Sequence, residues 1–287
     1  MTRRSRGGTR VSSTTSCPPG RFSGVSGSRT IVIGDVHGCL DELRELLDAV
    51  ASGPGDRLVF LGDLLDRGPD PVGVLRLVRS LGAECVLGNH EEKHLRYAAH
   101  EARRKSDPRY RNPMRPFDAK RAAEHAALTR DELLWLASLP RWIALGGRWV
   151  AVHGGLVPGL ALSAQPPDWA VKLRYVDAGG RPVPREAGEA AIPGVRRWAE
   201  AWTGPDSVVY GHFPVGNGAP RRDEPRPGVV CVGIDTGCVY GGALTALVLP
   251  SGGSPDSRGP TPRGPGAAEI VQVRSRQRSA RPPDSED

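Results

Sequence analysis

Five short polar motifs contain the residues of this chain that could do chemistry. Each motif combines Asp, Asn or His with glycine, and each follows a run rich in β-branched or aliphatic residues. Carboxylate and amide oxygens and imidazole nitrogens, with no thiolate among them, suit Mn, Fe or Zn better than a soft metal. The motifs are GDVHG (Gly34–Gly38), GDLLDRG (Gly62–Gly68), GNHE (Gly88–Glu91), HGG (His153–Gly155) and GH (Gly211–His212).

The candidate metal ligands in these motifs are Asp35, His37, Asp63, Asn89, His153 and His212. Two carboxylates are too few to neutralise two divalent cations, so such a site would keep positive charge that attracts phosphate and acidifies bound water. A single motif of this kind is more often an ordinary turn or a structural histidine. Five of them in order, each ending a predicted strand, indicate a metal-dependent enzyme.

The elements that must position these motifs follow an α/β pattern. In the first half strands and helices alternate, which predicts a parallel sheet with right-handed crossovers. The predicted strands are Ile31–Ile33, Leu58–Leu61 and Cys85–Leu87, and the predicted helices are 40–50, 71–81 and 91–104. In the second half the strands Trp149–Val152, Ser207–Tyr210, Val229–Val232 and Ala243–Leu249 are separated by loops and predict a second sheet packed on the first. Residues 105–140 are predicted to be a basic helical insertion, and 176–194 a loop or small hairpin.

Charge and composition separate the two ends of the chain from its middle. The net charge is +7, but residues 1–28 hold five arginines and no acid, and residues 251–287 hold six arginines and five acids. Both ends are rich in Ser, Gly, Pro and Arg and are predicted to be disordered tails. We therefore expect one catalytic domain over residues 29–250, and we expect a chain of residues 28–252 to fold without the tails.

Several classes of protein are excluded by what the sequence lacks. No apolar run approaches the ~20 residues of a membrane span, and the N-terminus has no signal-peptide apolar region. The five cysteines show no CxxC pair or zinc-finger spacing, and a reducing compartment without a structural disulfide is expected. We expect a cytoplasmic monomer that does not bind membranes.

The ordered motif set resembles the calcineurin-like metallophosphoesterase superfamily, in particular its phosphoprotein phosphatase branch, over roughly residues 29–250. The resemblance implies a two-sheet β-sandwich flanked by helices, with a dimetal site at the strand ends. It implies that Asp35 and His37 bind the first metal and that Asp63 bridges both. The second metal would be completed by Asn89, His153 and His212. Mn²⁺ is the expected metal, with Fe or Zn as alternatives.

The same resemblance implies roles for the residues that follow the ligands. A metal-bridging hydroxide would attack phosphorus in line. His90 would protonate the leaving oxygen, Asp66 would hold the tautomer of His90, and Arg67 would grip the phosphate oxygens bidentately. Arg174, in the motif LRYVD, is a candidate for a second phosphate contact or else a surface arginine. An exposed ion pair of Asp66 with Arg67 is the structural alternative for that pair.

The substrate is the least determined part of this interpretation. The stretch Ile234–Leu247 resembles bacterial members of the branch, which include protein phosphatases, diadenosine tetraphosphate hydrolases and an RNA end-repair module. Symmetrical tetraphosphate hydrolases commonly lack the aspartate that is here Asp66, so a serine/threonine phosphoprotein phosphatase is the first expectation. A diadenosine tetraphosphate hydrolase is the alternative. The basic insertion could bind polyphosphate or RNA, but its three aromatics are few for base stacking, and nucleic acid is not the expected substrate.

A protein without catalysis must also be considered. The chain could bind phosphorylated partners as a catalytically silent relative, although every ligand position and His90 are present. Hydrolysis of an aryl phosphate with Mn²⁺ would distinguish the two.

Overall fold

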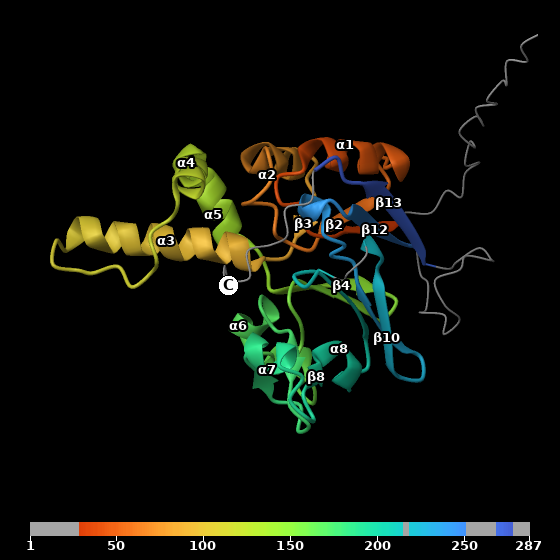
Figure 1. Cartoon of the computed structure of the whole chain (residues 1–287). Coiled ribbons are helices and arrows are strands. Elements are labelled where there is room, and N and C mark those ends of the chain that lie inside the picture. The colour runs from red at the N-terminus through yellow and green to blue at the C-terminus, as the bar shows by residue number, and fades with distance from the viewer. Residues whose placement is uncertain (1–28, 215–217, 251–267, 278–287) are drawn as a thin grey trace, which may run out of the picture.

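In the part of the chain that the structure describes, the strands form two five-stranded sheets and a small third sheet, with helices on the outer faces (Figure 1). The computed structural model describes residues 29–214, 218–250 and 268–277. The first sheet has the order β13-β12-β1-β2-β3 and the second the order β10-β11-β9-β5-β4. The two-sheet fold expected from the motifs is therefore confirmed.

The first sheet carries the alternation of strands and helices. Its strands are β1 (Thr30–Ile33), β2 (Arg57–Phe60), β3 (Glu84–Cys85), β12 (Ala243–Leu249) and β13 (Glu269–Arg274), and its covering helices are α1 (Leu40–Ala49) and α2 (Pro71–Ser80). The strands β1, β2 and β3 pair in parallel, as expected. Because side chains alternate along a strand, Ile31 and Ile33 belong to the cluster under α1 and α2, while Val32 belongs to the cluster that joins the two sheets.

In the second sheet, too, the side chains alternate between the face that packs on the first sheet and the outer face. Its strands are β4 (Trp142–Gly146), β5 (Trp149–Val152), β9 (Ser207–Tyr210), β10 (Arg221–Arg226) and β11 (Val229–Gly233). Ala151 joins the cluster between the sheets, whereas Val150 and Val152 join the outer cluster around Trp198 and Trp202. That outer layer contains α6 (Pro167–Ala170), α7 (Arg185–Glu189), α8 (Trp198–Ala201) and the three short strands β6 (Tyr175–Val176), β7 (Pro182–Val183) and β8 (Arg196–Arg197).

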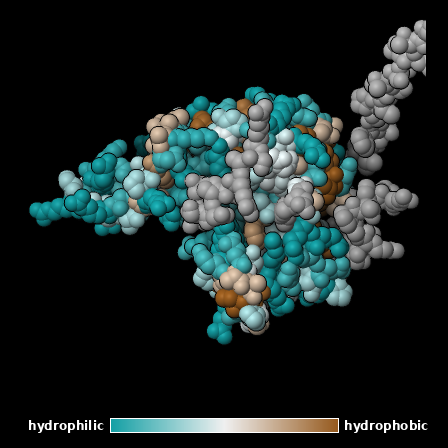
Figure 2. All heavy atoms as spheres, in the orientation of Figure 1, coloured by the Kyte–Doolittle hydropathy of each residue, from teal (hydrophilic) through white to brown (hydrophobic). Residues whose placement is uncertain are grey.

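The helical insertion projects from one side of the sandwich (Figure 1). It follows the long helix α3 (Asn89–Ser106) and contains α4 (Ala119–Ala127) and α5 (Arg130–Ser138). Asp118 caps α4 by accepting a hydrogen bond from the N–H of Arg121, and Thr129 caps α5 by accepting one from the N–H of Glu132. The outer part of the insertion is covered by hydrophilic residues on the face shown in Figure 2.

Four strands, among them the short strand β8, were not predicted from the sequence. The expectation that residues 251–287 are disordered is wrong for Glu269–Arg274, which form β13 and pair with β12. The other missed strands are β4 and the polar edge strand β10. The remaining tail predictions, for residues 1–28, 251–267 and 278–287, lie outside the described residues.

Two further observations concern cysteines and membranes. Cys39, Cys85, Cys231 and Cys238 are buried free thiols, while Cys17 lies outside the described residues.

Within the described ranges, every helix is too short or too polar to cross a lipid bilayer.

Ending the chain at residue 252 should destabilise it, contrary to the expectation from sequence. Val273 is buried, and Ile270 and Val271 pack partly buried against the same sheet. Their loss should cost on the order of 3 kcal/mol, which corresponds to a fall in melting temperature of roughly 6–12 °C. Thermal unfolding of residues 28–252 beside residues 28–277 measures this difference. Equal melting temperatures would show that β13 contributes nothing.

Candidate active site

The six predicted metal ligands lie at the carboxyl ends of parallel strands from both sheets. Asp35 and His37 follow β1, Asp63 follows β2, and Asn89 begins α3 after β3. In the second sheet His153 follows β5 and His212 follows β9, and these two strands are also parallel. A hydrogen bond of 2.9 Å from the backbone N–H of His212 to Asp35 Oδ2 joins the two halves of the chain. The structure thus brings together residues that are far apart in sequence.

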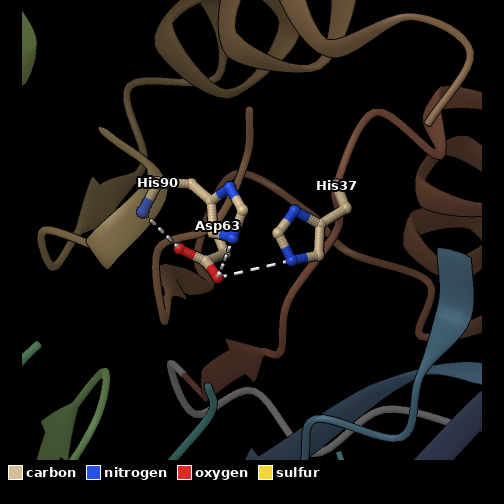
Figure 3. A group of neighbouring side chains, drawn as sticks. All are labelled: His37, Asp63 and His90. Carbon is tan, nitrogen blue, oxygen red and sulfur yellow. Dashed lines mark hydrogen bonds and ion pairs between the residues drawn. The ribbon is translucent and has the colours of Figure 1, made fainter. Parts of the chain in front are cut away.

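Asp63 lies at the centre of this cluster (Figure 3). Its carboxylate oxygens are 3.3 Å from Nε2 of His37 and 3.3 Å from Nε2 of His153. Asp63 belongs to two groups of possible ligands, one with His37 and His90 and one with His153 and His212, and within each group the donor atoms lie within 4.8 Å of one another. A carboxylate shared by two such groups is suited to bridging two metal ions.

Backbone carbonyls fix the orientation of two of the histidines. Nδ1 of His37 is 2.8 Å from the carbonyl oxygen of Leu65, and Nδ1 of His153 is 2.7 Å from that of Leu61. Each Nδ1 must therefore carry the proton and donate it, which leaves the lone pair on Nε2 facing Asp63. Metal-binding histidines are held in the same way by hydrogen bonds to their second nitrogen.

The surroundings of Asp35 and Asn89 also fit a cation. Oδ1 of Asn89 is 2.9 Å from Nε2 of His153 and 2.9 Å from Nδ1 of His212. Oδ1 of Asp35 is buried and has no hydrogen-bond partner among the described residues. Burial raises the pKa of Asp35 well above its usual value, and the nearby carboxylates of Asp235 and Asp63 raise it further. Crowded buried carboxylates with an orphaned oxygen are an environment that a divalent cation would stabilise, so the donor set fits metal ions.

Glycine is required beside the ligands because other atoms of the site approach the backbone too closely for a side chain. A Cβ on Gly88 would lie 2.3 Å from Asp63 Oδ1, and one on Gly62 would lie 2.6 Å from the backbone nitrogen of Gly88. Asp63 and His212 themselves have φ of +49° and +66°, which non-glycine residues rarely adopt. Strain of this kind is concentrated at functional sites.

His90 and Asp66 form a buried hydrogen-bonded pair. Nδ1 of His90 is 2.5 Å from Asp66 Oδ2, and Nε2 of His90 faces Asp63 Oδ2 at 3.9 Å. Burial lowers the pKa of His90 to about 4, although Asp63 and Asp66 act to raise it. Burial alone would raise the pKa of Asp66, but hydrogen bonds from His90, His94 and Arg121 hold it well below the usual range. This is the pairing that the resemblance implies; an exposed ion pair of Asp66 with Arg67 is not formed.

Two arginines contact histidines of the cluster. Nη1 of Arg67 lies 2.9 Å from Nε2 of His37, and Nε of Arg174 lies 3.0 Å from Nε2 of His212. Nε of Arg67 is buried, and the described part of the chain offers it no hydrogen-bond partner. The guanidinium of Arg67 lies 5.4 Å from the ring centre of Tyr240. Arg174 therefore lies at the site and is not a remote surface arginine. Both guanidinium groups can donate to an anion bound at the cluster.

Sequence reasoning missed the role of Glu91. Its buried carboxylate accepts hydrogen bonds from the backbone N–H groups of Asp63 (2.7 Å), Leu64 (2.9 Å) and Leu65 (3.0 Å). Burial raises the pKa of Glu91 to about 7, although the hydrogen bonds from the backbone N–H groups act to lower it. Glu91 thus holds the loop that carries Asp63. Its presence in the motif GNHE was a signal, but its partners could not be identified from spacing.

The chain is similar to known proteins over most of its length. The family model described as calcineurin-like phosphoesterase matches residues 28–243. A symmetrical bis(5′-nucleosyl)-tetraphosphatase of Erwinia tasmaniensis is 30% identical in an alignment 263 residues long that covers 76% of this chain and 93% of that protein. An asymmetrical bis(5′-nucleosyl)-tetraphosphatase of Halalkalibacterium halodurans is 32% identical over 248 residues, covering 76% and 89%.

Solved structures agree with these matches. A crystal structure assigned as a diadenosine tetraphosphatase has a TM-score of 0.65 and 29% identity, covering 87% of this chain and 95% of that one. A serine/threonine phosphatase of Saccharomyces cerevisiae has a TM-score of 0.56 at 14% identity, covering 90% and 82%. The second likeness concerns the fold alone.

Proposed function

The chain belongs to the calcineurin-like phosphoesterase family, and from this premise we propose that it hydrolyses bis(5′-nucleosyl) polyphosphates such as diadenosine tetraphosphate. As a member of this family it is a metal-dependent phosphoester hydrolase. The relatives at 30% and 32% identity are both tetraphosphatases. They favour what was the alternative from sequence and give no specific support to the serine/threonine phosphoprotein phosphatase that was first expected.

The observation that carries the proposal is the similarity to symmetrical and asymmetrical tetraphosphatases over most of the chain, together with a cluster in which Asp63 is shared by two groups of possible ligands. The guanidinium groups of Arg67 and Arg174 lie beside His37 and His212 of this cluster. On a tetraphosphate chain, Arg67 and Arg174 would each contact a different phosphate. Two arginines can also bind one phosphate, so the choice of a polyphosphate substrate rests on the relatives.

Two divalent ions would be held by the six predicted ligands, with Mn²⁺ as our proposal for their identity. When bound, such ions polarise phosphate oxygens and lower the pKa of coordinated water. Asp35 and His37 would belong to one ion and Asn89, His153 and His212 to the other, with Asp63 between them. The orphaned Oδ1 of Asp35 supports this assignment.

The remaining roles are carried by side chains of the chain itself. Arg67 and Arg174 would orient the phosphates, and His90 would deliver a proton from Nε2 to the leaving oxygen. Asp66 accepts the hydrogen bond from Nδ1 of His90 and so stabilises the protonated ring. A bound phosphate beside Nε2 would further favour the protonated ring, because it is negatively charged. We also propose that the enzyme is a cytoplasmic monomer; the free thiols of the four described cysteines fit a reducing compartment.

In the decisive experiment the purified protein is incubated with Mn²⁺ and, in parallel reactions, with diadenosine tetraphosphate or a phosphothreonine peptide. The products are separated by chromatography. We expect kcat/KM for the dinucleotide to exceed that for the peptide by at least about tenfold, and we expect EDTA to abolish both activities. ADP as the single product would mean symmetrical cleavage, and ATP with AMP asymmetrical cleavage. Phosphate release from the peptide alone would overturn the proposal, and inactivity on both substrates would favour a silent phosphate-binding protein.

A further inference from the structure

Charged side chains of helix α4 contact the catalytic loop, the segment that carries Asp66 and Arg67. Lys120, Arg121 and Glu124 lie on one helix and all contact the segment Asp66–Gly68. That segment carries the aspartate paired with His90 and the arginine that faces His37. The sequence alone left open whether this part of the insertion binds an extended substrate or is a solvated surface.

Four hydrogen bonds make up this contact. Nε of Arg121 donates to Asp66 Oδ1 at 2.7 Å, and the backbone N–H of Asp66 donates to Glu124 Oε1 at 2.8 Å. Nζ of Lys120 donates to the backbone carbonyls of Arg67 and, at 3.0 Å, of Gly68. Every residue of the segment Asp66–Gly68 is therefore hydrogen-bonded by α4: Asp66 by Arg121 and Glu124, and the carbonyls of Arg67 and Gly68 by Lys120.

The loop needs such support because its backbone is strained. Asp66 has φ of +66° and Arg67 has φ of +69°, and both are in the left-handed region without being glycine. Residues in this region keep their conformation only where surrounding structure over-determines it. The contacts from α4 supply that restraint on one side of the loop.

Arg121 also determines which oxygen of Asp66 is available to His90. Oδ1 is occupied by Arg121 and by Nε2 of His94 at 3.3 Å, which leaves Oδ2 for Nδ1 of His90. Only 11% of the Arg121 side chain is exposed, and its guanidinium lies 5.6 Å from the ring centre of Phe117. The cation is thus held inside the insertion and faces away from bulk solvent.

We propose that α4 is a clamp for the catalytic loop and that Arg121 is a positioning residue, which acts through Asp66 to hold His90 in place. This inference rests on the proposed role of His90 in protonating the leaving oxygen. It assigns two of the basic residues of the insertion, Lys120 and Arg121, to the organisation of the site and not to binding of nucleic acid or protein.

A double-mutant cycle tests the proposal with phenyl phosphate, a poor leaving group, and p-nitrophenyl phosphate, a good one. In the Mn²⁺-loaded full chain, Arg121→Ala should lower kcat for phenyl phosphate by about 10–100-fold, with a smaller loss for p-nitrophenyl phosphate and little change in KM. In a His90→Asn background the same substitution should cause no further loss. Arg111→Ala, an exposed arginine of the same insertion, is the matched control and should retain full activity.

Different outcomes separate this inference from the function on which it rests. If His90→Asn alone shows no dependence on the leaving group, the proposed role of His90 fails. If His90→Asn behaves as expected but Arg121→Ala lowers activity equally in both backgrounds, the positioning role is overturned. Circular dichroism reports folding, and Arg121→Gln, which keeps an N–H donor, replaces the alanine variant if that does not fold; it should recover part of the lost kcat.

Discussion

Replacing Asp63 with asparagine should remove nearly all phosphoesterase activity. Asp63 is shared by both groups of possible ligands, and each of its oxygens lies 3.3 Å from a histidine nitrogen. The neutral amide keeps the shape but loses the charge that a bridging ligand supplies, so both metals should bind more weakly. Because metal ions contribute several kcal/mol to transition-state stabilisation, kcat/KM should fall by roughly 10³-fold or more.

The measurement is kcat/KM for p-nitrophenyl phosphate together with metal content by elemental analysis. Asp168→Asn makes the same chemical change at an exposed position of α6 and should retain both activity and metal. An Asp63→Asn protein that keeps full activity would refute the assignment of the site. Full metal content with no activity would show that Asp63 acts on the reaction and is not needed to hold the ions.

The second large effect is expected for His90→Asn. Nδ1 of His90 is held by Asp66, and Nε2 faces Asp63 inside the cluster. Loss of a general acid slows poor leaving groups most, because activated aryl esters depart without a proton. The kcat for phenyl phosphate should fall by about 10²–10⁴-fold, and the kcat for p-nitrophenyl phosphate should fall far less.

Metal content distinguishes this role from a second reading of the geometry. His90 also belongs to a group of possible ligands with His37 and Asp63 (Figure 3). If His90→Asn loses metal and slows both substrates equally, His90 is a ligand and the proton must come from elsewhere. His100→Asn, further along α3, is the matched control and should change neither quantity.

Strands with a clear pattern of burial could be predicted from the sequence, and strands without one could not. Ser207–Tyr210 and Ala243–Leu249 were predicted with the bounds found in the structure, because continuous apolar runs bounded by polar residues are typical of buried strands. Strand β10 is polar throughout and pairs at an edge, so hydrophobic periodicity does not reveal it. Strand β4 had a usable signal: the Gly146–Gly147 pair between two apolar runs is typical of a hairpin.

The residues of the site also include some whose position could be predicted from the sequence and some whose position could not. Every predicted ligand lies within a few residues of the end of a strand, so its place at the sheet edge could be inferred from local sequence. The partners of Asp66 could not, since Arg121 is 55 residues away and reaches it through the packing of an insertion. The residue types were visible, but the contact depends on how the insertion folds back over the loop.

The order of strands in the first sheet has a consequence for folding during synthesis. Strand β1 leaves the ribosome first among the strands, yet its antiparallel neighbour β12 comes roughly 200 residues later. At translation rates of ~5–20 residues per second, β1 waits roughly 10–40 s before that edge is paired. Strand β2 is synthesised much sooner and can pair with β1 in parallel, but the other side of β1 is covered only when β12 and β13 have been made. We therefore expect nascent chains stalled before β12 to need chaperone protection of that open edge.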